Sequence, residues 1–322
     1  MNISIVIPVF NRPEELSELL NSIANQDCND FEVIVVEDGS TNISETVCRN
    51  FQHKIPLQYI KQENKGPGIA RNTGAIYAKG NWIIFLDSDC ILPNNYLKIV
   101  KKEIITDRFD CFGGPDMAHT SFNSIQKAIG YAMSSILTTG GIRGAKESFD
   151  IFYPRSFNLG VKKEIFNSLS GFSDMRYGED LDFSMRLLKK GFSTQLLKNV
   201  YVFHKRRNNF VSFFKQVHNS GIARINLENR HPGTIKPVHC LPTLFIFGNL
   251  LIIALAFIIP LILIFLAVFP ALILIHAAIK TKEVKTTLLA VIASFVQLFG
   301  YGSGFFKALI LKFLNLSNIL TK

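Results

Sequence analysis

The stretch WIIFLDSDCIL, residues 82–92, decides the fold of this chain. Its five leading apolar residues predict a strand that is covered on both faces, which is typical of the centre of a parallel sheet. Two acids, Asp87 and Asp89, follow one residue apart. Because an unpaired charge at the end of a buried strand costs free energy, these acids need either a cation or a turn that uses them. The pair is therefore a candidate ligand for a divalent metal, or the turn that ends the strand.

The residues before this stretch predict a β-α-β unit. Residues 3–9 read as a buried strand, and Pro13 opens a segment with leucines at helical spacing. Residues 31–40 form a second strand with a turn, residues 57–61 a third, and a Gly/Pro-rich loop enters a helix near Ile69. Parallel strands joined in this way place their carboxyl ends on one edge, where ligands bind. The acids expected at this edge are Glu37, Asp38, Asp87 and Asp89.

Composition narrows the class of protein. The chain has 322 residues, 48% of them hydrophobic, and a formal net charge of +10. Basic residues gather just before a long apolar run, as in the cytoplasmic flanks of membrane helices, and they do not interleave with aromatic residues as in nucleic-acid readers. We therefore expect membrane lipid as a partner and no nucleic acid. These basic residues are Lys205, Arg206, Arg207, Lys215, Arg224, Arg230 and Lys236.

The cysteines and the N-terminus indicate a reduced, cytoplasmic setting for the first half of the chain. The five cysteines have neither CxxC nor Cys/His spacing, which argues against structural zinc. The first apolar run is too short for a signal peptide and has no basic residues before it. We expect the cysteines to be ordinary thiols.

A long apolar tail predicts membrane helices. Residues 243–279 carry no charge, and residues 286–306 are similarly apolar. A straight helix of 37 residues would be about 55 Å long against a hydrocarbon core of about 30 Å, so Pro260 or Pro270 is expected to divide the run. The third segment is either a span or a re-entrant or interfacial segment, because GYGSG at 300–304 weakens a helix. The predicted spans are about 243–260, 261–279 and 286–306.

Two segments lie between the first strands and this tail. Residues 109–148 are weakly patterned and are expected to be the variable half of an enzyme domain. Residues 206–242 contain apolar side chains at helical spacing beside basic residues, which fits a helix in the membrane interface and equally a helix packed in a core. Those apolar residues are Phe210, Phe213, Phe214 and Val217.

Five motifs, in their order along the chain, resemble those of family 2 glycosyltransferases with the GT-A fold. They are VIPVFNR (6–12), VIVVEDGS (33–40), GPGIARNTGA (66–75), FLDSD (85–89) and GEDLDFSMRLLKKG (178–191). The resemblance covers about residues 2–205. It implies an α/β, Rossmann-like fold with a mostly parallel central sheet flanked by helices, followed here by an α-helical membrane region. Each motif is weak alone, but the ordered set is specific.

The resemblance implies that six residues bind the nucleotide sugar: Pro8, Val9, Glu37, Asp38, Arg71 and Asp87. Pro8 and Val9 match the backbone segment along the base, Glu37 and Asp38 match the acid pair that reaches the nucleotide, and Arg71 matches a nearby basic residue. A carboxylate can accept the imide N–H of uracil, which makes the role of Asp38 chemically reasonable. Taken in isolation, Asp38 equally fits an Asx turn and Arg71 a surface ion pair.

DSD then matches the DxD motif of the family, which implies Mg²⁺ or Mn²⁺ as the cofactor. By this likeness Asp87 faces the sugar or ribose, and Asp89 coordinates the metal that bridges the phosphates. Hard oxygen ligands suit these ions, which stabilise the charge that grows on a diphosphate leaving group. His204 falls where some GT-A enzymes place a histidine near metal or diphosphate, although a lone histidine is usually satisfied locally.

GED matches the base motif, with Asp180 as the general base and Glu179 beside it. Direct displacement needs a carboxylate within hydrogen-bond reach of the acceptor hydroxyl, on the face opposite the leaving group. An acid at a helix start is otherwise a cap or a partner of the helix dipole. Asp182, two residues later, is expected to be structural.

The resemblance therefore implies a membrane-anchored enzyme that transfers a single sugar, with inversion, from a nucleotide-diphosphate sugar to an acceptor hydroxyl. Processive synthases carry Q-x-x-R-W, but here Gln216 is followed by VHNSG and Trp82 is the only tryptophan. The expected acceptor is a glycan or lipid-linked molecule of cell-envelope or surface glycan assembly. The alternatives are a polyprenyl-phosphate glycosyltransferase and a non-catalytic nucleotide-binding membrane scaffold.

The expected organisation has three parts. Residues 1–205 form the GT-A domain, residues 206–242 a basic amphipathic interfacial linker, and residues 243–322 a membrane region with two or three transmembrane helices. The expected location is the inner (cytoplasmic) membrane as a multi-pass protein, with the catalytic domain facing the cytoplasm.

Overall fold

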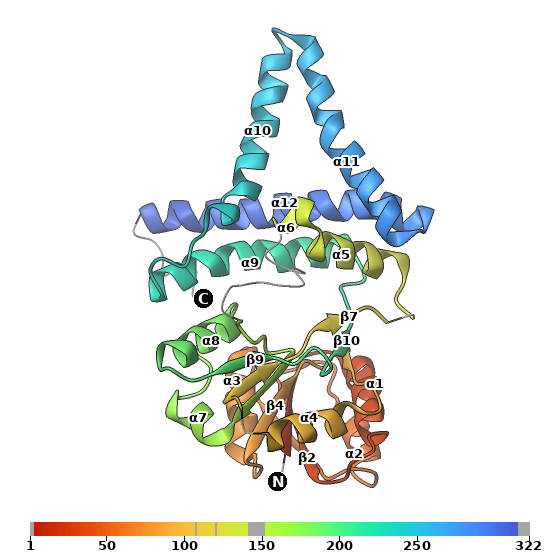
Figure 1. Cartoon of the computed structure of the whole chain (residues 1–322), viewed down its shortest axis with the longest axis vertical. Coiled ribbons are helices and arrows are strands. Elements are labelled where there is room, and N and C mark those ends of the chain that lie inside the picture. Colours follow the sequence, from red (N-terminus) through yellow and green to blue (C-terminus); the bar gives the residue numbers. More distant parts are fainter. Residues whose placement is uncertain (1–2, 107, 120, 141–151, 315–322) are drawn as a thin grey trace. The chain divides into compact units, whose positions relative to one another are not determined.

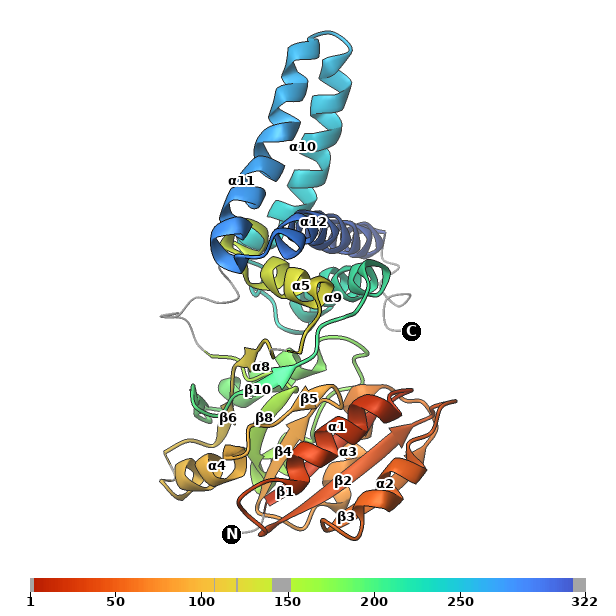
Figure 2. The same ribbon diagram turned by 90° about the vertical axis from the view of Figure 1, so that its right-hand side faces the viewer.

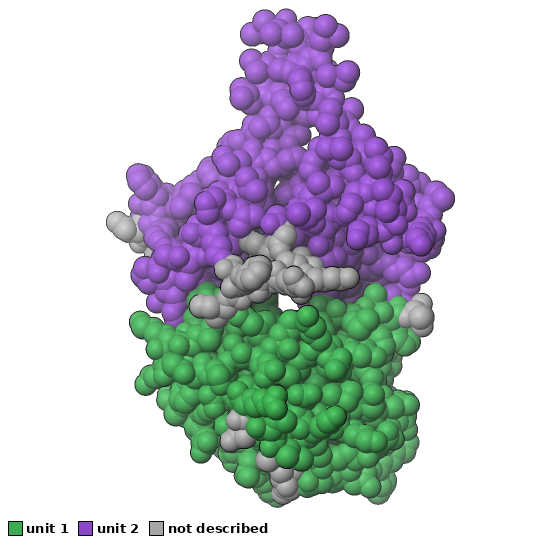
Figure 3. Space-filling model, in the orientation of Figure 1, with its two compact units in different colours: residues 1–119, 150–204 green, residues 120–149, 205–322 purple. Residues whose placement is uncertain are grey.

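The computed structural model of the chain describes residues 3–106, 108–119, 121–140 and 152–314. These residues form two compact units, shown in different colours in Figure 3. The first unit combines residues up to 119 with residues 150–204, and the second combines residues 120–149 with residues 205–322. Residues 141–148, at the end of the segment predicted to be the variable half, lie outside the described residues.

A seven-stranded sheet forms the centre of the first unit. Its strands are β1 (Ile3–Val9), β2 (Phe31–Asp38), β3 (Leu57–Gln62), β4 (Trp82–Leu86), β6 (Cys111–Gly113), β8 (Asn158–Lys162) and β9 (Thr194–Leu196). Their order across the sheet is β3-β2-β1-β4-β8-β6-β9. The first four strands run parallel, whereas β8 is antiparallel to both of its neighbours. All five residues of β4 are buried, as expected for a strand covered on both faces.

Helices cover both faces of this sheet (Figure 1). One face carries α1 (Pro13–Ala24), α2 (Glu45–Phe51) and α4 (Tyr96–Ile105), and the other carries α3 (Pro67–Tyr77), α7 (Lys163–Ser168) and α8 (Glu179–Lys189). Successive side chains of a strand point to opposite faces, so Ile5 joins the first core and Val6 the second. This arrangement confirms the predicted α/β architecture.

A second, small sheet brings a distant segment to the end of β4. It consists of β5 (Cys90–Ile91), β10 (Val202–His204) and β7 (Asp116–Met117) (Figure 2). In the antiparallel pair of β5 and β10, His204 lies opposite Cys90. The pairing therefore fixes His204 beside the turn that contains Asp87 and Asp89.

The second unit is helical. Its helices are α5 (Ser124–Ser134), α6 (Ile136–Thr139), α9 (Phe210–Arg230), α10 (Leu241–Ala256), α11 (Ile264–Thr281) and α12 (Val284–Phe313), with 3₁₀ turns at Pro237–His239 and Pro260–Leu263. The helices α9 and α12 lie side by side in both ribbon views. A Cβ added at Gly304 would lie 2.0 Å from the carbonyl oxygen of His218. Glycine therefore permits the close approach of these two helices, and α12 runs unbroken through the GYGSG sequence that was expected to weaken it.

The helix α9 is packed into the core of this unit on one face. Phe213 and Val217 are buried in a cluster with residues of α5 and α12, whereas the side chain of Phe214 is 38% exposed. Ala128 and Ala132 of α5 belong to the same cluster. The structure thus groups α5 and α6 with the C-terminal helices, which differs from the expected boundary at residue 205, because their apolar residues find partners there and not on the sheet.

The helices α10 and α11 form a hairpin (Figures 1 and 2). The helical segment is interrupted around Pro260, where a 3₁₀ turn begins, whereas Pro270 lies inside α11. Phe257 and Leu261, near the tip, are 88% and 86% exposed. By length and composition, two described helical segments are apolar enough to cross a membrane, Pro260–Thr281 and Val284–Phe313.

Candidate active site

The carboxyl ends of the parallel strands bring the predicted site residues to one edge of the sheet. β1 ends at Val9, β2 at Asp38 and β4 at Leu86, and all three strands run in the same direction. Asp87 and Asp89 follow β4 directly, in the turn that leads to β5. The acids expected at this edge are therefore in the positions that the sheet topology predicted.

Asp89 lies between the guanidinium of Arg12 and the imidazole of His204. One oxygen forms an ion pair with Arg12, at the N-terminal cap of α1, and the other lies 3.0 Å from Nε2 of His204. Burial alone would raise the pKa of Asp89, but His204 and Arg12 outweigh it and hold that pKa well below its usual range. Asp89 is therefore ionised at neutral pH.

Arg71 joins the two acid motifs. Its guanidinium donates to Asp87 Oδ1 at 2.6 Å and to Glu179 Oε1 at 2.8 Å, and it lies over the ring of Phe172 at 5.6 Å. The side chain is only 3% exposed. Burial opposes its charge, but Asp87 and Glu179 more than compensate and raise the pKa of Arg71. The arginine therefore fixes the distance between the end of β4 and the start of α8.

The first two residues of α8 differ in their electrostatic surroundings. Asp180 accepts from Arg155 Nε at 2.6 Å and from the backbone N–H of Leu181 at 2.8 Å. Burial would raise the pKa of Asp180, but Arg155 and Arg71 lower it overall. Burial and the charge of Asp180 raise the pKa of Glu179 to about 7, against the effect of Arg71. Asp180 is thus the ionised acid of the pair at neutral pH.

Asp182 lies on the buried side of α8, away from this pair. It is 1% exposed and accepts from Arg186 Nε at 2.9 Å. Arg186 also donates to the carbonyl oxygens of Leu169 and Gly171. These contacts fasten α8 to the loop before it, in keeping with a structural part for Asp182.

The two acids at the end of β2 hold neighbouring loops. Asp38 accepts from the side chain of Gln62 at 2.7 Å and from the backbone N–H groups of Lys65 and Gly66, both at 2.9 Å. A carboxylate has about four acceptor positions, and these hydrogen bonds use three of them. Glu37 is 2% exposed and accepts from Ser40, Ser44 and Tyr59. It supports the segment that begins α2.

Pro8 and Val9 line the end of β1. The pairing of β1 with β4 extends only to Val6, whereas its pairing with β2 continues to Val9 opposite Glu37. The backbone of Pro8 and Val9 therefore has no β4 neighbour on one side. Asp87 and Asp89 follow the end of β4, at the same edge of the sheet.

The donor atoms near Asp89 fit a divalent cation. Atoms of Asp89, Cys90 and His204 lie within 4.8 Å of one another. Carboxylate oxygen and imidazole nitrogen suit Mn²⁺, and oxygen alone suits Mg²⁺. Cys90 is fully buried and bonds to the carbonyl oxygen of Phe157, and burial raises its pKa well above the usual value. Within the described residues, this leaves Asp89 and His204 as the fitting donors of the group. Asp87, also predicted as a ligand, lies outside the group and pairs with Arg71.

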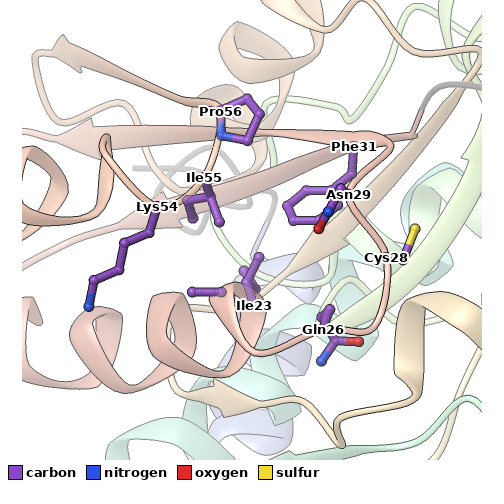
Figure 4. Close-up of a pocket in the computed structure, with 9 residues that line it drawn as sticks. Ile23, Gln26, Cys28, Asn29, Phe31, Lys54, Ile55 and Pro56 are labelled. Carbon is purple, nitrogen blue, oxygen red and sulfur yellow. The ribbon is translucent and has the colours of Figure 1, made fainter.

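A pocket at the opposite edge of the sheet contains no comparable chemistry. It lies beside Phe31, where β2 begins, and Pro56, just before β3 (Figure 4). Its lining residues are Ile23, Ala24, Gln26, Cys28, Asn29, Phe31, Lys54, Ile55 and Pro56. No carboxylate is among them, so the acids at the carboxyl edge are the better candidate for a site.

Sequence reasoning missed two arginines of this site, Arg12 and Arg155. Arg12 lies three residues after the end of β1, so its position near the carboxyl edge was a usable signal. Arg155 lies three residues before β8 in a segment without a motif, and only the folded chain brings it to Asp180. Within the described residues, each predicted acid at this site except Asp38 and Glu37 is paired with an arginine.

Comparison with known proteins supports the resemblance. A family model described as Glycosyl transferase family 2 matches residues 4–166, just over half of the chain. Glycosyltransferase GlyA of Streptococcus pneumoniae is 38% identical over 111 residues, which cover 34% of this chain and 16% of that protein. An uncharacterised glycosyltransferase of Haemophilus influenzae is 30% identical over 197 residues, covering 58% of this chain and 62% of that protein. The chain therefore spans less than two thirds of the length of these relatives.

A solved structure shares the fold. The mannosyltransferase PcManGT from Pyrobaculum calidifontis, in complex with GDP-Man and Mn²⁺, superposes with a TM-score of 0.64 at 18% identity. The superposition covers 91% of this chain and 86% of that one. The family model matches more than half of this chain, and the likeness in fold agrees with it. Both agree with the motifs and their placement at one edge of the sheet. The chain belongs to glycosyl transferase family 2.

Proposed function

We propose that the chain is a metal-dependent, inverting glycosyltransferase that moves a single sugar from a nucleotide-diphosphate sugar to an acceptor hydroxyl. One observation carries this proposal. Arg71 joins the acids after β4 to the acids that begin α8, so a donor-binding group and a base lie at opposite ends of one fixed side chain. A scaffold that only bound nucleotides would have no need for the second acid pair.

The donor side of the proposed site consists of residues at the ends of β1, β2 and β4. Asp38, with one acceptor position left, can receive the imide N–H of a base that lies along Pro8 and Val9. Asp89, with Asp87 and His204, would hold Mg²⁺ or Mn²⁺, which stabilises negative charge on the departing diphosphate. The complex of PcManGT with GDP-Man and Mn²⁺ supports a donor of this class.

The acceptor side depends on Asp180. Its low pKa keeps the carboxylate ionised, and its contacts with Arg155 and Leu181 hold its orientation. The carboxylate takes the proton of the acceptor hydroxyl as that oxygen bonds to the anomeric carbon. The bond between this carbon and the phosphate oxygen breaks on the opposite face, and its electron pair leaves with the nucleoside diphosphate. This displacement inverts the anomeric centre.

The reaction is tested with purified full-length protein and UDP-, GDP- and dTDP-sugars, with and without Mn²⁺. A thermal-shift screen of the same donors finds the nucleotide first, because a ligand that binds the folded state raises its apparent stability. We expect release of nucleoside diphosphate only with divalent metal, and a product with inverted configuration by NMR. Full activity in Asp89→Asn and Asp180→Asn variants would overturn the assignment.

The hairpin of α10 and α11 supports a membrane anchor. Its exposed apolar surface includes Phe257 and Leu261, and the run of 37 residues around it carries no charge. Soluble proteins rarely expose apolar surface of this extent. We propose that the hairpin enters the cytoplasmic membrane from the cytoplasmic side, where the basic residues before it contact anionic lipid.

Membrane attachment is tested by flotation with vesicles. The double variant Phe257→Asp, Leu261→Asp should leave the vesicle fraction, because moving each new charge from water into the membrane costs free energy. Ile76→Asp, at a 76% exposed apolar residue of α3, is the matched control and should float as the wild type does. Unchanged flotation of the double variant would contradict the proposed anchor.

The same anchor favours an acceptor that is itself held in the membrane. The candidates are a lipid-linked sugar of envelope glycan assembly and bare polyprenyl phosphate. The labelled product distinguishes the two acceptors. Radiolabel on bare polyprenyl phosphate would identify polyprenyl phosphate as the acceptor, and radiolabel only on an existing lipid-linked glycan would identify the lipid-linked sugar.

A further inference from the structure

Arg12 is the arginine of the site whose position the proposed reaction does not yet explain. It follows β1 and precedes the first turn of α1, with a non-helical backbone. Its guanidinium pairs with Oδ2 of Asp89, and its side chain is 26% exposed. Among the described residues, the guanidinium of Arg12 donates its side-chain hydrogen bond to Asp89. Arg12 therefore lies at the same carboxylate that fits a divalent cation.

The other two arginines of the site are committed elsewhere. Arg71 is 3% exposed and bridges two carboxylates, and Arg155 pairs with Asp180. A move by Arg71 would leave both Asp87 and Glu179 without their partner in a buried place, which costs several kcal/mol. Arg12 differs from Arg71 because it is more exposed and holds a single oxygen, so it can exchange partners at a lower cost. Arg155 is 37% exposed, but its partner Asp180 is not among the acids that fit the cation.

We propose that Arg12 and the divalent cation compete for Asp89, and that the displaced guanidinium then pairs with the diphosphate of the donor. A guanidinium and a metal ion at one carboxylate oxygen repel each other, since both are positive. The planar fork of an arginine matches two phosphate oxygens, and a diphosphate is the anion that arrives with the metal. This inference rests on the proposed function, because it takes the metal and the nucleotide as its ligands.

The consequence is that metal and nucleotide bind cooperatively. Metal alone must displace Arg12 from Asp89 and leave the guanidinium without an anion, which weakens metal binding. Metal together with a nucleoside diphosphate restores an anion to Arg12, which strengthens binding of both. Coupling of this kind is reciprocal and typically changes each affinity by about 5- to 150-fold. Free metal in the cell would then occupy the site mainly when the donor is present.

The experiment measures Mn²⁺ binding by the EPR signal of free Mn²⁺, on full-length protein in detergent, with and without UDP or GDP. We compare the wild type with Arg12→Gln, Arg12→Lys and the control Arg49→Gln. Arg49 is a 72% exposed arginine of α2 paired with Glu45, so its loss removes the same charge away from the site. Thermal melting of each variant checks that the fold is retained.

We expect Arg12→Gln to bind Mn²⁺ about tenfold more tightly than the wild type without nucleotide. The nucleotide should then add little further tightening, whereas it should tighten Mn²⁺ binding by the wild type. Arg12→Lys keeps the positive charge and should therefore still compete with Mn²⁺. Because lysine lacks the planar guanidinium, the nucleotide should tighten Mn²⁺ binding by this variant less than by the wild type. Arg49→Gln should match the wild type.

Mn²⁺ affinity of Arg12→Gln that equals or falls below that of the wild type would overturn the proposal, because Arg12 would then support the metal site. Absence of Mn²⁺ binding in every variant would overturn it as well. Failure of the proposed function looks different: Arg12→Gln would still tighten Mn²⁺ binding, but the wild type would transfer sugar from none of the donors. Sugar transfer with unchanged Mn²⁺ affinity in Arg12→Gln would defeat only the role of Arg12.

Discussion

The acids that follow β4, Asp87 and Asp89, and the acids that begin α8, Glu179 and Asp180, are both set beside arginines, but the two pairs are charged differently. Asp89 has Arg12 and His204 as partners, and its pKa is lowered. At α8, Asp180 is the acid with a lowered pKa, whereas the pKa of Glu179 is raised to about 7.

The difference follows from how the arginines are shared. Arg155 serves Asp180, but Arg71 divides its charge between Glu179 and Asp87. Glu179 therefore receives less compensation for its burial than Asp180 does. Environments that push the pKa values of neighbouring acids apart are typical of sites with separate roles for each acid. In the proposed function, the α8 pair handles the proton and the β4 pair handles the cation.

The largest expected effect tests the α8 pair. Asp180→Asn keeps the shape of the side chain but removes the base, so kcat should fall by about 10³-fold with little change in KM for the donor. Initial rates of nucleoside diphosphate release measure it. Glu164→Gln, at an exposed acid in the first turn of α7, is the matched control and should retain wild-type rates. A loss of less than tenfold would remove Asp180 from the proton-transfer role.

The second prediction tests the β4 pair. Asp89→Asn weakens the hold on a divalent cation and on Arg12 together, so transfer should fall by about 10²-fold. The rate should also lose its saturation with Mn²⁺, which a titration from micromolar to millimolar Mn²⁺ measures. Asp180→Asn should keep the wild-type Mn²⁺ dependence, and this opposite behaviour separates the two pairs. Equal Mn²⁺ dependence in both variants would contradict the assignment of different roles to the two acid pairs.

The sheet and its acids could be predicted because their signals are local. Five apolar residues in a row predict the central strand β4, and the β-α-β pattern predicts the direction of its neighbours. Direction alone then places Asp38, Asp87 and Asp89 on one edge, whatever the details of packing. These predictions depend on residue type and strand order, which the sequence states directly.

The partners of the acids could not be predicted in the same way. Arg155 reaches Asp180 across 25 positions, and Arg71 reaches Glu179 across 108. Such pairs depend on how loops and helices pack on the sheet, which no short motif encodes. The helical unit gave a similar result, since Gly300 and Gly304 weaken an isolated helix but fit the surface of α9. Tertiary contact reversed the effect of local propensity there.

The third prediction concerns the charge on the base. Arg155→Gln removes the partner that contributes most to lowering the pKa of Asp180, so this pKa should rise. Since the base must be ionised, the acid limb of the profile of kcat/KM against pH should move to higher pH by a similar amount. Rates at high pH should change little. Arg176→Gln, at an exposed arginine just before α8, is the control and should leave the profile in place.

A purely structural part for Arg155 would give another result. Its loss would then lower the rate equally at every pH, and the limb would not move. A lower rate with an unchanged profile would therefore mean that Arg71 and the helix start lower the pKa of Asp180 without Arg155. The difference in pKa between Asp180 and Glu179 would then not follow from how the arginines are shared.

The smallest expected effect concerns Glu179 and stability. Its pKa in the folded protein, about 7, lies above the ordinary value of 4.5. The folded state therefore binds this proton more tightly than the unfolded state, and the stabilisation is complete below about pH 4.5 and is lost as pH rises through about 7. Glu179→Gln removes this dependence, so its melting temperature relative to the wild type should rise by a few degrees between pH 5 and pH 8. Thermal melts at both pH values measure the change, with Glu164→Gln as the control. A difference between variant and wild type that is the same at both pH values would mean that Glu179 is ionised throughout, and the two acid pairs would then carry their charge in the same way.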